Sequence, residues 1–451
     1  MAQTDLSPIE DKAEMVEWIA AGCKPKSSWR IGTEHEKIGF NSETLHPLPY
    51  EGGVSIFAML EGLKKFGWQG VEEGGYLIAL KREGASVSLE PGGQFELSGA
   101  PLESIHQTCG EVNRHLREVR EIAEQIGAGF LSLGFRPVTR LEDVPVMPKG
   151  RYKIMRAYMP KVGKLGLEMM FRTCTVQTNL DFSSEADMVK KMRVSLALQP
   201  VATALFANSP FKDGKPNGYK SYRSRIWLDT DPARTGMLPF AFEDGFGFER
   251  YVDYALDVPM YFVHRGDTYL DASGKSFRDF LNGRLDILPG EKPTLTDFED
   301  HLSTIFPEVR LKQFLEMRGA DTGPWSQLCA LPAFWVGLLY DEAALDAAWD
   351  WVKDWSAEER DRLRRDVPKY GLQTRFRGQT VQDMARRALV LAREGLKTRH
   401  RLNAYGESET IFLADLDDMA TTGKSNADKL LERYHGAWQG DITRVYQECV
   451  F

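Results

Sequence analysis

Glu34 and Glu36 are the first residues whose type and spacing suggest chemistry. They lie in the stretch 29–40, which is rich in Trp, Ile, Thr and Phe, contains no proline, and is predicted to be a strand. Side chains two apart in a strand share a face, so the two carboxylates repel each other unless a cation is present. For one such pair alone, a surface location or structural ion pairs with arginines would be the simpler explanation.

A predicted β-hairpin repeats the arrangement. Pro91, Gly92 and Gly93 form its turn, and Glu90 and Glu96 share its polar face. If residue 90 pairs with residue 94, the two glutamates become diagonal neighbours about 7–8 Å apart. Exposure to solvent would explain such a face equally well when it is taken in isolation.

Six oxygen-bearing side chains on the polar faces of predicted strands form one candidate metal site. They are Glu34, Glu36, Glu90, Glu96, Gln177 and Glu316. A ligand set without Cys or His suits Mg²⁺, with Mn²⁺ as an alternative. Five carboxylates exceed the need of one ion, so we expect two or three ions, which in one site typically hold a triphosphate while a phosphoryl group moves.

Three arginines could complete a clamp for anionic groups. Arg151 lies in a basic cluster that opens a helix, and such a cluster is often only a solvated surface. Arg223 lies in a Gly/Pro-rich region that leaves it free to reach a ligand. Arg318 follows Glu316 by two positions on a predicted strand 310–318, and so shares its face.

The elements that would position these residues are mixed. The first 320 residues bear the predicted strands, with a long amphipathic helix predicted at 102–126 and a second helix, acidic at its start, at 184–206; the chain from residue 322 onward is mostly helical. Two apparent phosphate loops, ending at Lys275-Ser276 and Lys424-Ser425, lack the first glycine of that motif, and no Gly-x-Gly-x-x-Gly opens a strand–helix unit. A nucleotide would therefore bind neither in a P-loop nor in a Rossmann crevice.

Composition restricts the class of protein. The chain has 451 residues, a net charge of −8 and a pI near 5.7, which argues against a nucleic-acid-binding surface. No apolar run reaches the length needed to span a membrane. The five cysteines are odd in number and far apart, and the first fifteen residues lack a signal-peptide core and are acidic for a transit peptide. These features predict a cytoplasmic protein without membrane or nucleic-acid partners, as a monomer or weak homodimer.

Several long segments resemble the glutamate–cysteine ligases of the plant and proteobacterial type. The resemblance covers nearly the whole chain and is strongest in IGTEHEKIGF (31–40), SLEPGGQFELSG (88–99), MPKGRYKIMRAYMPKVG (147–163), FRTCTVQTNLDFSSEADM (171–188), GYKSYRSRIWLDTD (218–231) and TIFPEVRLKQFLEMRGAD (304–321). It implies an α+β fold similar to glutamine synthetase and the guanidino kinases. In that fold a curved antiparallel sheet holds metals and ATP on its concave face and carries helices on its outer face.

The resemblance also implies an organisation and individual roles. We expect one catalytic domain over 1–451, with a sheet-bearing part at about 1–320 and a helical part at about 321–451 packed on it. The five glutamates would bind metal, and Gln177 would stand where distant ligases use a histidine. Arg151 and Arg223 match arginines that contact substrate carboxylate or phosphate and would be catalytic. Arg223, Tyr261 and Arg318 would bind substrate.

The implied reaction is ATP-dependent ligation of L-glutamate to L-cysteine, the first step of glutathione synthesis. Phosphorylation turns the side-chain carboxylate into an acyl phosphate, which the amine of cysteine attacks, so the protein mainly positions reactants and neutralises charge. Three alternatives remain open from the residues: a ligase with another amine acceptor, a two-metal phosphohydrolase or nuclease, and a non-catalytic binding protein.

Cys109 and Cys329 match positions at which some plant members of the family form a disulfide. The simpler interpretation in a reducing cell is two free, buried thiols in helices. A bond would require Cα atoms within about 7 Å. A second plant disulfide, associated with dimer control, would need cysteines at Ala272 and Ile287, so that switch is not expected here.

Overall fold

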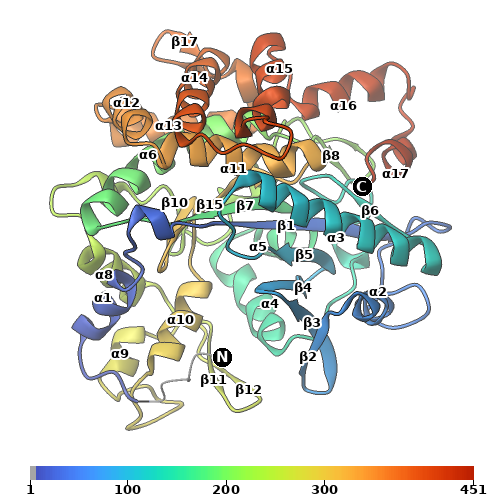
Figure 1. Ribbon diagram of the computed structural model, residues 1–451. Coiled ribbons are helices and arrows are strands. Elements are labelled where there is room, and N and C mark those ends of the chain that lie inside the picture. Colours follow the sequence, from blue (N-terminus) through green and yellow to red (C-terminus); the bar gives the residue numbers. More distant parts are fainter. Residues whose placement is uncertain (1–6) are drawn as a thin grey trace.

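The protein is described from a computed structural model that covers residues 7–451 (Figure 1). Part of the N-terminal stretch used above to predict location, residues 1–6, lies outside the described residues. The chain folds around a nine-stranded sheet with the order β14-β15-β7-β1-β5-β4-β3-β2, and β6 pairs with β1. Every pairing in this sheet is antiparallel. The prediction of an α+β fold built on an antiparallel sheet is confirmed.

The strands of this sheet come mainly from the first 321 residues. They are β1 (Ile31–Asn41), β2 (Gln69–Glu73), β3 (Tyr76–Arg82), β4 (Ala85–Leu89), β5 (Gln94–Ser98), β6 (Ala128–Leu131), β7 (Thr175–Leu180), β14 (Val309–Leu311) and β15 (Leu315–Asp321). Residues 7–451 also form four two-stranded sheets, one of which consists of β11 (Phe262–Arg265) and β12 (Thr268–Asp271).

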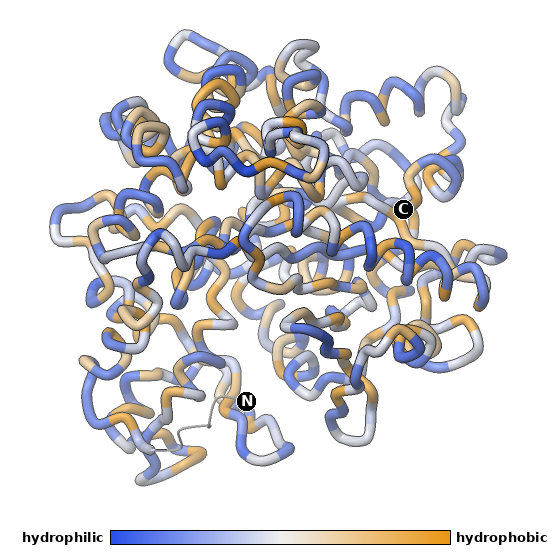
Figure 2. The backbone as a smooth tube through the Cα atoms, in the orientation of Figure 1, coloured by the Kyte–Doolittle hydropathy of each residue, from blue (hydrophilic) through white to orange (hydrophobic). Residues whose placement is uncertain are grey.

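Three long helices pack on the outer face of the sheet (Figure 1). They are α3 (Ile105–Ile126), α6 (Glu185–Leu205) and α11 (Trp325–Leu339). A capping box between Ser104 and Gln107 begins α3 and Gly127 ends it in a left-handed conformation, so its bounds lie close to the predicted 102–126. In Figure 2, α3 alternates between hydrophilic and hydrophobic segments along its length, as an amphipathic helix does, whereas α11 is buried along nearly all of its length.

Shorter helices flank the opposite face of the sheet. They are α4 (Gly150–Val162), α5 (Gly166–Arg172), α7 (Tyr222–Trp227) and α10 (Leu295–Ser303). Past β15 the chain is helical apart from one small hairpin, with α12 (Glu342–Val352), α13 (Ala357–Tyr370), α14 (Val381–Arg399), α15 (Ala414–Thr422) and α16 (Asn426–His435). Within residues 7–451 no single helix is long and apolar enough to span a membrane; only α11 with α12 passes by length and composition, as a pair bent by 86°.

The edge of the sheet differs from the prediction in one respect. The sequence suggested a single strand over 310–318, but the structure has two antiparallel strands, β14 and β15, joined by residues 312–314. The turn contains no glycine or proline, so the usual signal for a chain reversal is missing. The reversal places Arg310 directly opposite Glu316.

A disulfide joins two of the outer helices. Cys109 of α3 and Cys329 of α11 are bonded, with Cα atoms 5.6 Å apart and a sequence separation of 220. The interpretation of these cysteines as free thiols is therefore wrong, because the packing of α3 on α11 brings them within bonding distance. The disulfide covalently links two helices that cover the same face of the sheet.

We predict that reducing this disulfide lowers the free energy of unfolding by about 2–4 kcal/mol, because the bond restricts a long loop in the unfolded chain. Urea unfolding with and without dithiothreitol measures the effect. The double variant Cys109→Ser/Cys329→Ser is the control and should be insensitive to reductant. Equal midpoints for the wild type in both conditions would contradict the prediction.

Candidate active site

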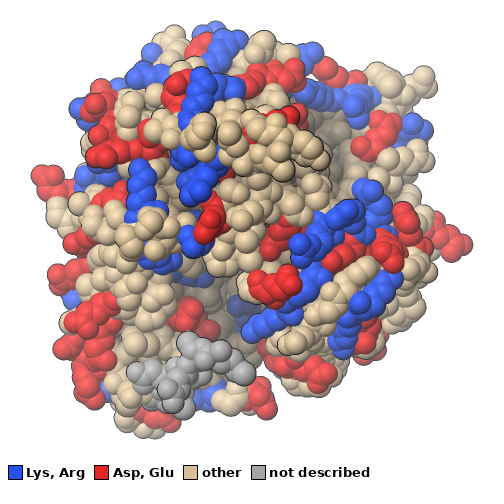
Figure 3. Space-filling model, in the orientation of Figure 1, with Lys and Arg blue, Asp and Glu red and all other residues tan. Residues whose placement is uncertain are grey.

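A cleft lies against the face of the sheet opposite α3 and α11. Its walls come from β1, β7, β15, α4, α5 and α7. Six of the predicted site residues line it: Glu36, Glu90, Arg151, Gln177, Arg223 and Arg318. In the view of Figure 3 the surface is hollowed between the segments around α10 and those around β2–β4, with acidic and basic side chains mixed around it.

Three carboxylates form one half of this polar face. Glu36 of β1 lies directly opposite Glu96 of β5, and the predicted pairing of Glu90 with Gln94 is confirmed by a 2.9 Å backbone hydrogen bond. Gly92 holds the hairpin turn close to α5: a Cβ at this position would lie 2.2 Å from the carbonyl oxygen of Phe171. The β4–β5 hairpin and the pairing of β5 with β1 therefore bring Glu36 together with two acids more than 50 residues later in the chain.

Burial and neighbouring carboxylates raise the proton affinity of Glu36 and Glu96. Burial, followed by the charges of Glu96 and Glu90, raises the pKa of Glu36 well above its ordinary value. Burial and the charge of Glu90 raise the pKa of Glu96 to about 8. The backbone N–H of Thr175 and the hydroxyl of Ser98 donate to Glu36 and Glu96 respectively, which offsets only part of the cost.

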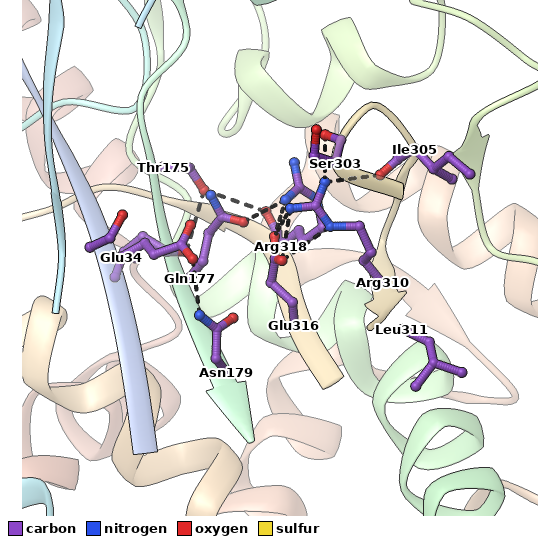
Figure 4. Close-up of polar contacts among 12 residues, drawn as sticks. Glu34, Thr175, Gln177, Asn179, Ser303, Ile305, Arg310, Leu311, Glu316 and Arg318 are labelled. Carbon is purple, nitrogen blue, oxygen red and sulfur yellow. Dashed lines mark hydrogen bonds and ion pairs between the residues drawn. The ribbon is translucent and has the colours of Figure 1, made fainter. Parts of the chain in front are cut away.

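The other half of the polar face is already balanced by arginines (Figure 4). Glu316 is fully buried and makes a two-pronged ion pair with Arg310, with N–O distances of 2.8–3.1 Å, and a second ion pair with Arg318. Burial would raise the pKa of Glu316, but the two guanidiniums outweigh it and hold the pKa well below its ordinary value. Glu34 accepts a 2.9 Å hydrogen bond from Asn179.

Gln177 is engaged on the same side. Its Oε1 accepts a 2.8 Å hydrogen bond from Nη1 of Arg318. Its amide oxygen, the atom that would bind a metal, is thus directed to an arginine. Among the described residues, 7–451, no group of three or more His, Cys, Asp or Glu side chains is arranged to hold a metal. The unpaired carboxylates of Glu36, Glu90 and Glu96 nevertheless have the chemistry that Mg²⁺ prefers.

Arg223 is the most constrained of the cleft arginines. Its side chain is 2% exposed, and Nη2 donates to the carbonyl of Arg318 at 2.8 Å. Its Nε and Nη1 are buried without a hydrogen-bond partner within residues 7–451. Buried donors of this kind are costly unless a ligand accepts from them. The expectation that Arg223 lies in a flexible segment is wrong, because Ser221 caps the short helix α7, which carries it.

Tyr261 does not line the cleft. It is buried just before β11, with its hydroxyl 3.3 Å from the sulfur of Met159, and the guanidinium of Arg234 lies over its ring at 3.8 Å. Burial raises the pKa of its hydroxyl. The structure thus places the predicted pocket residue behind the wall of the cleft, where its contact with α4 reaches the substrate side only indirectly.

Sequence reasoning missed Arg310, Asn179 and Thr175. Arg310 is the main partner of Glu316, and its role depends on the unrecognised turn between β14 and β15. Asn179 and Thr175 share the polar face of β7 with Gln177. Their alternation with apolar residues was a usable signal, but uncharged side chains carried too little weight beside glutamates.

A cleft with unpaired carboxylates on one side and unsatisfied guanidinium donors on the other is typical of enzymes that handle multiply charged anions with cations. The chain matches the family described as glutamate-cysteine ligase family 2 (GCS2) over residues 30–448. It belongs to that family.

Similar proteins include the chloroplastic glutamate–cysteine ligases of Nicotiana tabacum and Arabidopsis thaliana. Their identities to this chain are 60% and 57% over 441 residues, and each alignment covers 98% of this chain and 83% of the relative. Two solved structures share the fold. A glutamate–cysteine ligase from Francisella tularensis in complex with AMP has a TM-score of 0.55 at 14% identity, covering 93% of this chain and 88% of its own. A bifunctional glutathione synthetase from Pasteurella multocida has a TM-score of 0.53 at 12% identity, covering 97% and 54%.

The relatives correct the predicted location. Those from Nicotiana tabacum, Solanum lycopersicum, Oryza sativa and Arabidopsis thaliana are all named as chloroplastic proteins. The prediction of a cytoplasmic protein is therefore wrong. It depended on cysteine spacing and on the charge of the first residues, which do not separate one reducing compartment from another.

The carboxylate half of the site predicts a pH-dependent stability. A carboxyl whose pKa is raised on folding stabilises the folded state fully below its unfolded pKa, about 4.5, and this contribution is lost as pH rises through the folded pKa, about 8 for Glu96. In EDTA, the free energy of unfolding should fall by about 1–2 kcal/mol between pH 5 and pH 8. This fall is smaller than the full linkage value of about 1.36 kcal/mol per unit of pKa shift, because solvent reaches the cleft and screens the charges.

Urea unfolding at several pH values measures this dependence. The variant Glu96→Gln is the control, since it removes the titrating group from its place opposite Glu36. Its stability should vary less over the same pH range. A wild-type profile that is flat, or that rises with pH, would contradict the assignment.

Proposed function

We infer that this chain is a glutamate–cysteine ligase, which joins the γ-carboxylate of L-glutamate to the amine of L-cysteine with hydrolysis of ATP to ADP and phosphate. The observation that carries the proposal is the charge arrangement of the cleft in a chain that matches its family over residues 30–448. The whole chain, 1–451, would act as one catalytic domain.

The chemistry requires an activated carboxylate. An oxygen of the γ-carboxylate attacks the γ-phosphorus of ATP, ADP leaves, and an acyl phosphate forms. The cysteine nitrogen then attacks the acyl carbon, phosphate leaves with the bonding electrons, and the nitrogen loses a proton. Each step gathers negative charge, so the protein acts mainly by orientation and by cationic groups in fixed positions. No nucleophilic side chain is needed.

Arg223 is suited to hold a carboxylate of glutamate. Two of its three side-chain nitrogens, Nε and Nη1, have no partner among the described residues, and the third, Nη2, donates to the carbonyl of Arg318, which fixes the plane of the guanidinium. Arg151, whose Nε is also unpartnered, lies on the first turn of α4 and lines the same cleft. We assign it to phosphate oxygens. Arg318 makes an ion pair with Glu316 and donates a hydrogen bond to Gln177.

Divalent cations, two or three Mg²⁺ or Mn²⁺ ions, would be held first by Glu36, Glu90 and Glu96. When bound, they supply neutralisation of the phosphate charge. Glu34, Glu316 and Gln177 complete the proposed set only if their present partners, Asn179, Arg310 and Arg318, give way. ATP, glutamate and cysteine are the proposed small-molecule partners.

The test of the function is a product assay. Wild-type protein is incubated with ATP, Mg²⁺, glutamate and each common amino acid in turn, and the products are read by mass spectrometry. We expect γ-glutamylcysteine with stoichiometric ADP. A γ-glutamyl product with a different amine would show a ligase of other specificity, and ADP formation without any amide would exclude a ligase.

We predict that Glu36→Gln lowers turnover by orders of magnitude at saturating Mg²⁺, since the amide keeps the shape but removes a charge that the cations need. Without metal the variant should be as stable as the wild type or more so, because repulsion with Glu96 is relieved. Retention of more than about a tenth of wild-type kcat, a barrier change of only about 1.4 kcal/mol, would remove Glu36 from the ligand set.

We predict that Arg223→Lys keeps the fold and lowers kcat/KM for glutamate by about 2–4 kcal/mol in transition-state terms. An ammonium cannot make the two parallel bonds of a guanidinium, and the held carboxylate also orients the one that reacts, so KM and kcat should both suffer. Steady-state kinetics with varied glutamate measure this. Arg225→Lys, on the same short helix but outside the cleft, is the matched control. A near-normal kcat/KM for glutamate in Arg223→Lys would mean that Arg151 or Arg318, and not Arg223, holds the carboxylate.

A further inference from the structure

Asp321, the last residue of β15, is a buried carboxylate outside the lining of the cleft. Its side chain is 1% exposed and accepts three hydrogen bonds. They come from the backbone N–H of Asn208 at 2.9 Å, the hydroxyl of Ser209 at 2.6 Å and the hydroxyl of Ser221 at 2.8 Å. A buried carboxylate that accepts three hydrogen bonds requires an explanation, because burying a charge is expensive even with hydrogen bonds.

All three donors belong to the segment that leads into Arg223. The hydroxyl of Ser209 accepts the backbone N–H of Arg223 at 3.1 Å, and Ser221 is the N-cap of α7. Asp321 therefore holds the two ends of the loop 208–221 together and sets where α7 begins. The direction in which Arg223 leaves its helix follows from these contacts.

The space around Asp321 is closed by backbone. Gly134 approaches so closely that a Cβ there would lie 2.5 Å from the Cβ of Asp321. In the same strand a register shift between Met317 and Ala320 interrupts the pairing of β15 with β7, and the carbonyl of Arg318 within it accepts from Nη2 of Arg223. Within this short stretch of β15, Asp321 thus holds the start of α7, and the carbonyl of Arg318 holds the guanidinium of Arg223.

Asp321 also supplies charge. Burial lowers the pKa of the Arg223 guanidinium, and the carboxylate of Asp321 is the largest of the charges that oppose this, ahead of Glu36 and Glu308. The hydrogen bonds orient the arginine, and the negative charge keeps a buried cation tolerable when no anion is bound.

We propose that Asp321 is a positioning residue for the reaction: through Ser209 and Ser221 it fixes the direction of Arg223, and with its charge it supports that guanidinium in the buried wall of the cleft. The consequence for glutamate rests on the proposed function. The arrangement itself rests only on the contacts given above.

The test is a double-mutant cycle with Asp321→Asn and Arg223→Lys. In the wild-type background, Asp321→Asn should lower kcat/KM for glutamate about 10- to 100-fold and change KM for ATP less than about threefold. In the Arg223→Lys background the same substitution should cost less than about threefold, because the group through which it acts is already impaired. Equal losses in both backgrounds would overturn the proposal.

Two further variants separate positioning from general destabilisation. Glu409→Gln is the matched control, since Glu409 is equally buried, accepts the backbone N–H of Ile105 at 2.7 Å, and lies away from the cleft. It should lower the melting temperature without changing the glutamate kinetics. If Asp321→Asn does not fold, Ser209→Ala is the deciding variant. We expect it to lower kcat/KM for glutamate by a smaller factor and to leave the other kinetic constants unchanged. Unchanged kinetics in Ser209→Ala would then refute the role of Asp321.

A crystal structure of Asp321→Asn gives a readout that does not depend on the reaction. We expect the start of α7 to move and the 2.8 Å bond between Arg223 and the carbonyl of Arg318 to lengthen or break. An unchanged guanidinium would overturn the proposal. If the wild type forms no γ-glutamylcysteine, the proposed function fails, while this comparison still decides whether Asp321 positions Arg223.

Discussion

Repulsion between like charges is the constraint on which this structure depends. The antiparallel register places Glu36 opposite Glu96, a pairing that destabilises a sheet when both side chains are charged. The surrounding segments compensate the negative charge to different extents in the two halves of the site. Around Glu316 the protein supplies two guanidiniums of its own, whereas around Glu36, Glu90 and Glu96 it leaves the negative charge largely unpaired. Such an excess is tolerated only where an external cation or bound protons offset it.

Rigidity on the outer face of the sheet makes that excess possible. The long helices α3, α6 and α11 bury an extensive apolar core, and the disulfide links two of them. Hydrophobic burial of this extent stabilises the fold by far more than a few repelling carboxylates destabilise it. The cleft side can therefore hold side chains in positions that serve a ligand rather than the fold, which is the usual balance between a scaffold and its site.

Local patterns allowed much of the sheet to be predicted from sequence. The two-residue spacing of Glu34 and Glu36 gave the faces of β1, alternation of apolar and polar residues gave those of β5 and β7, and the Pro-Gly-Gly turn gave the pairing of Glu90 with Gln94. What failed was one chain reversal without a sequence signal and one set of contacts between distant segments. The turn after β14 carries no glycine or proline, so Arg310 could not be paired with Glu316. The short helix of Arg223 forms because Asp321, about 100 residues away, accepts from its cap.

The division of the site into two halves follows from which strand each acid occupies. Glu316 lies on β15, next to the edge strand β14, which alone can bring Arg310 across from it. Glu36 and Glu96 lie on β1 and β5, where the register pairs Glu96 with Glu36 on one side and with Ser88 on the other, so no arginine lies across from Glu96 in the sheet. Cationic groups must then approach from outside its plane, as Arg223 does from α7. The register of the strands thus determines where the protein neutralises its own charge and where that task is left to a ligand.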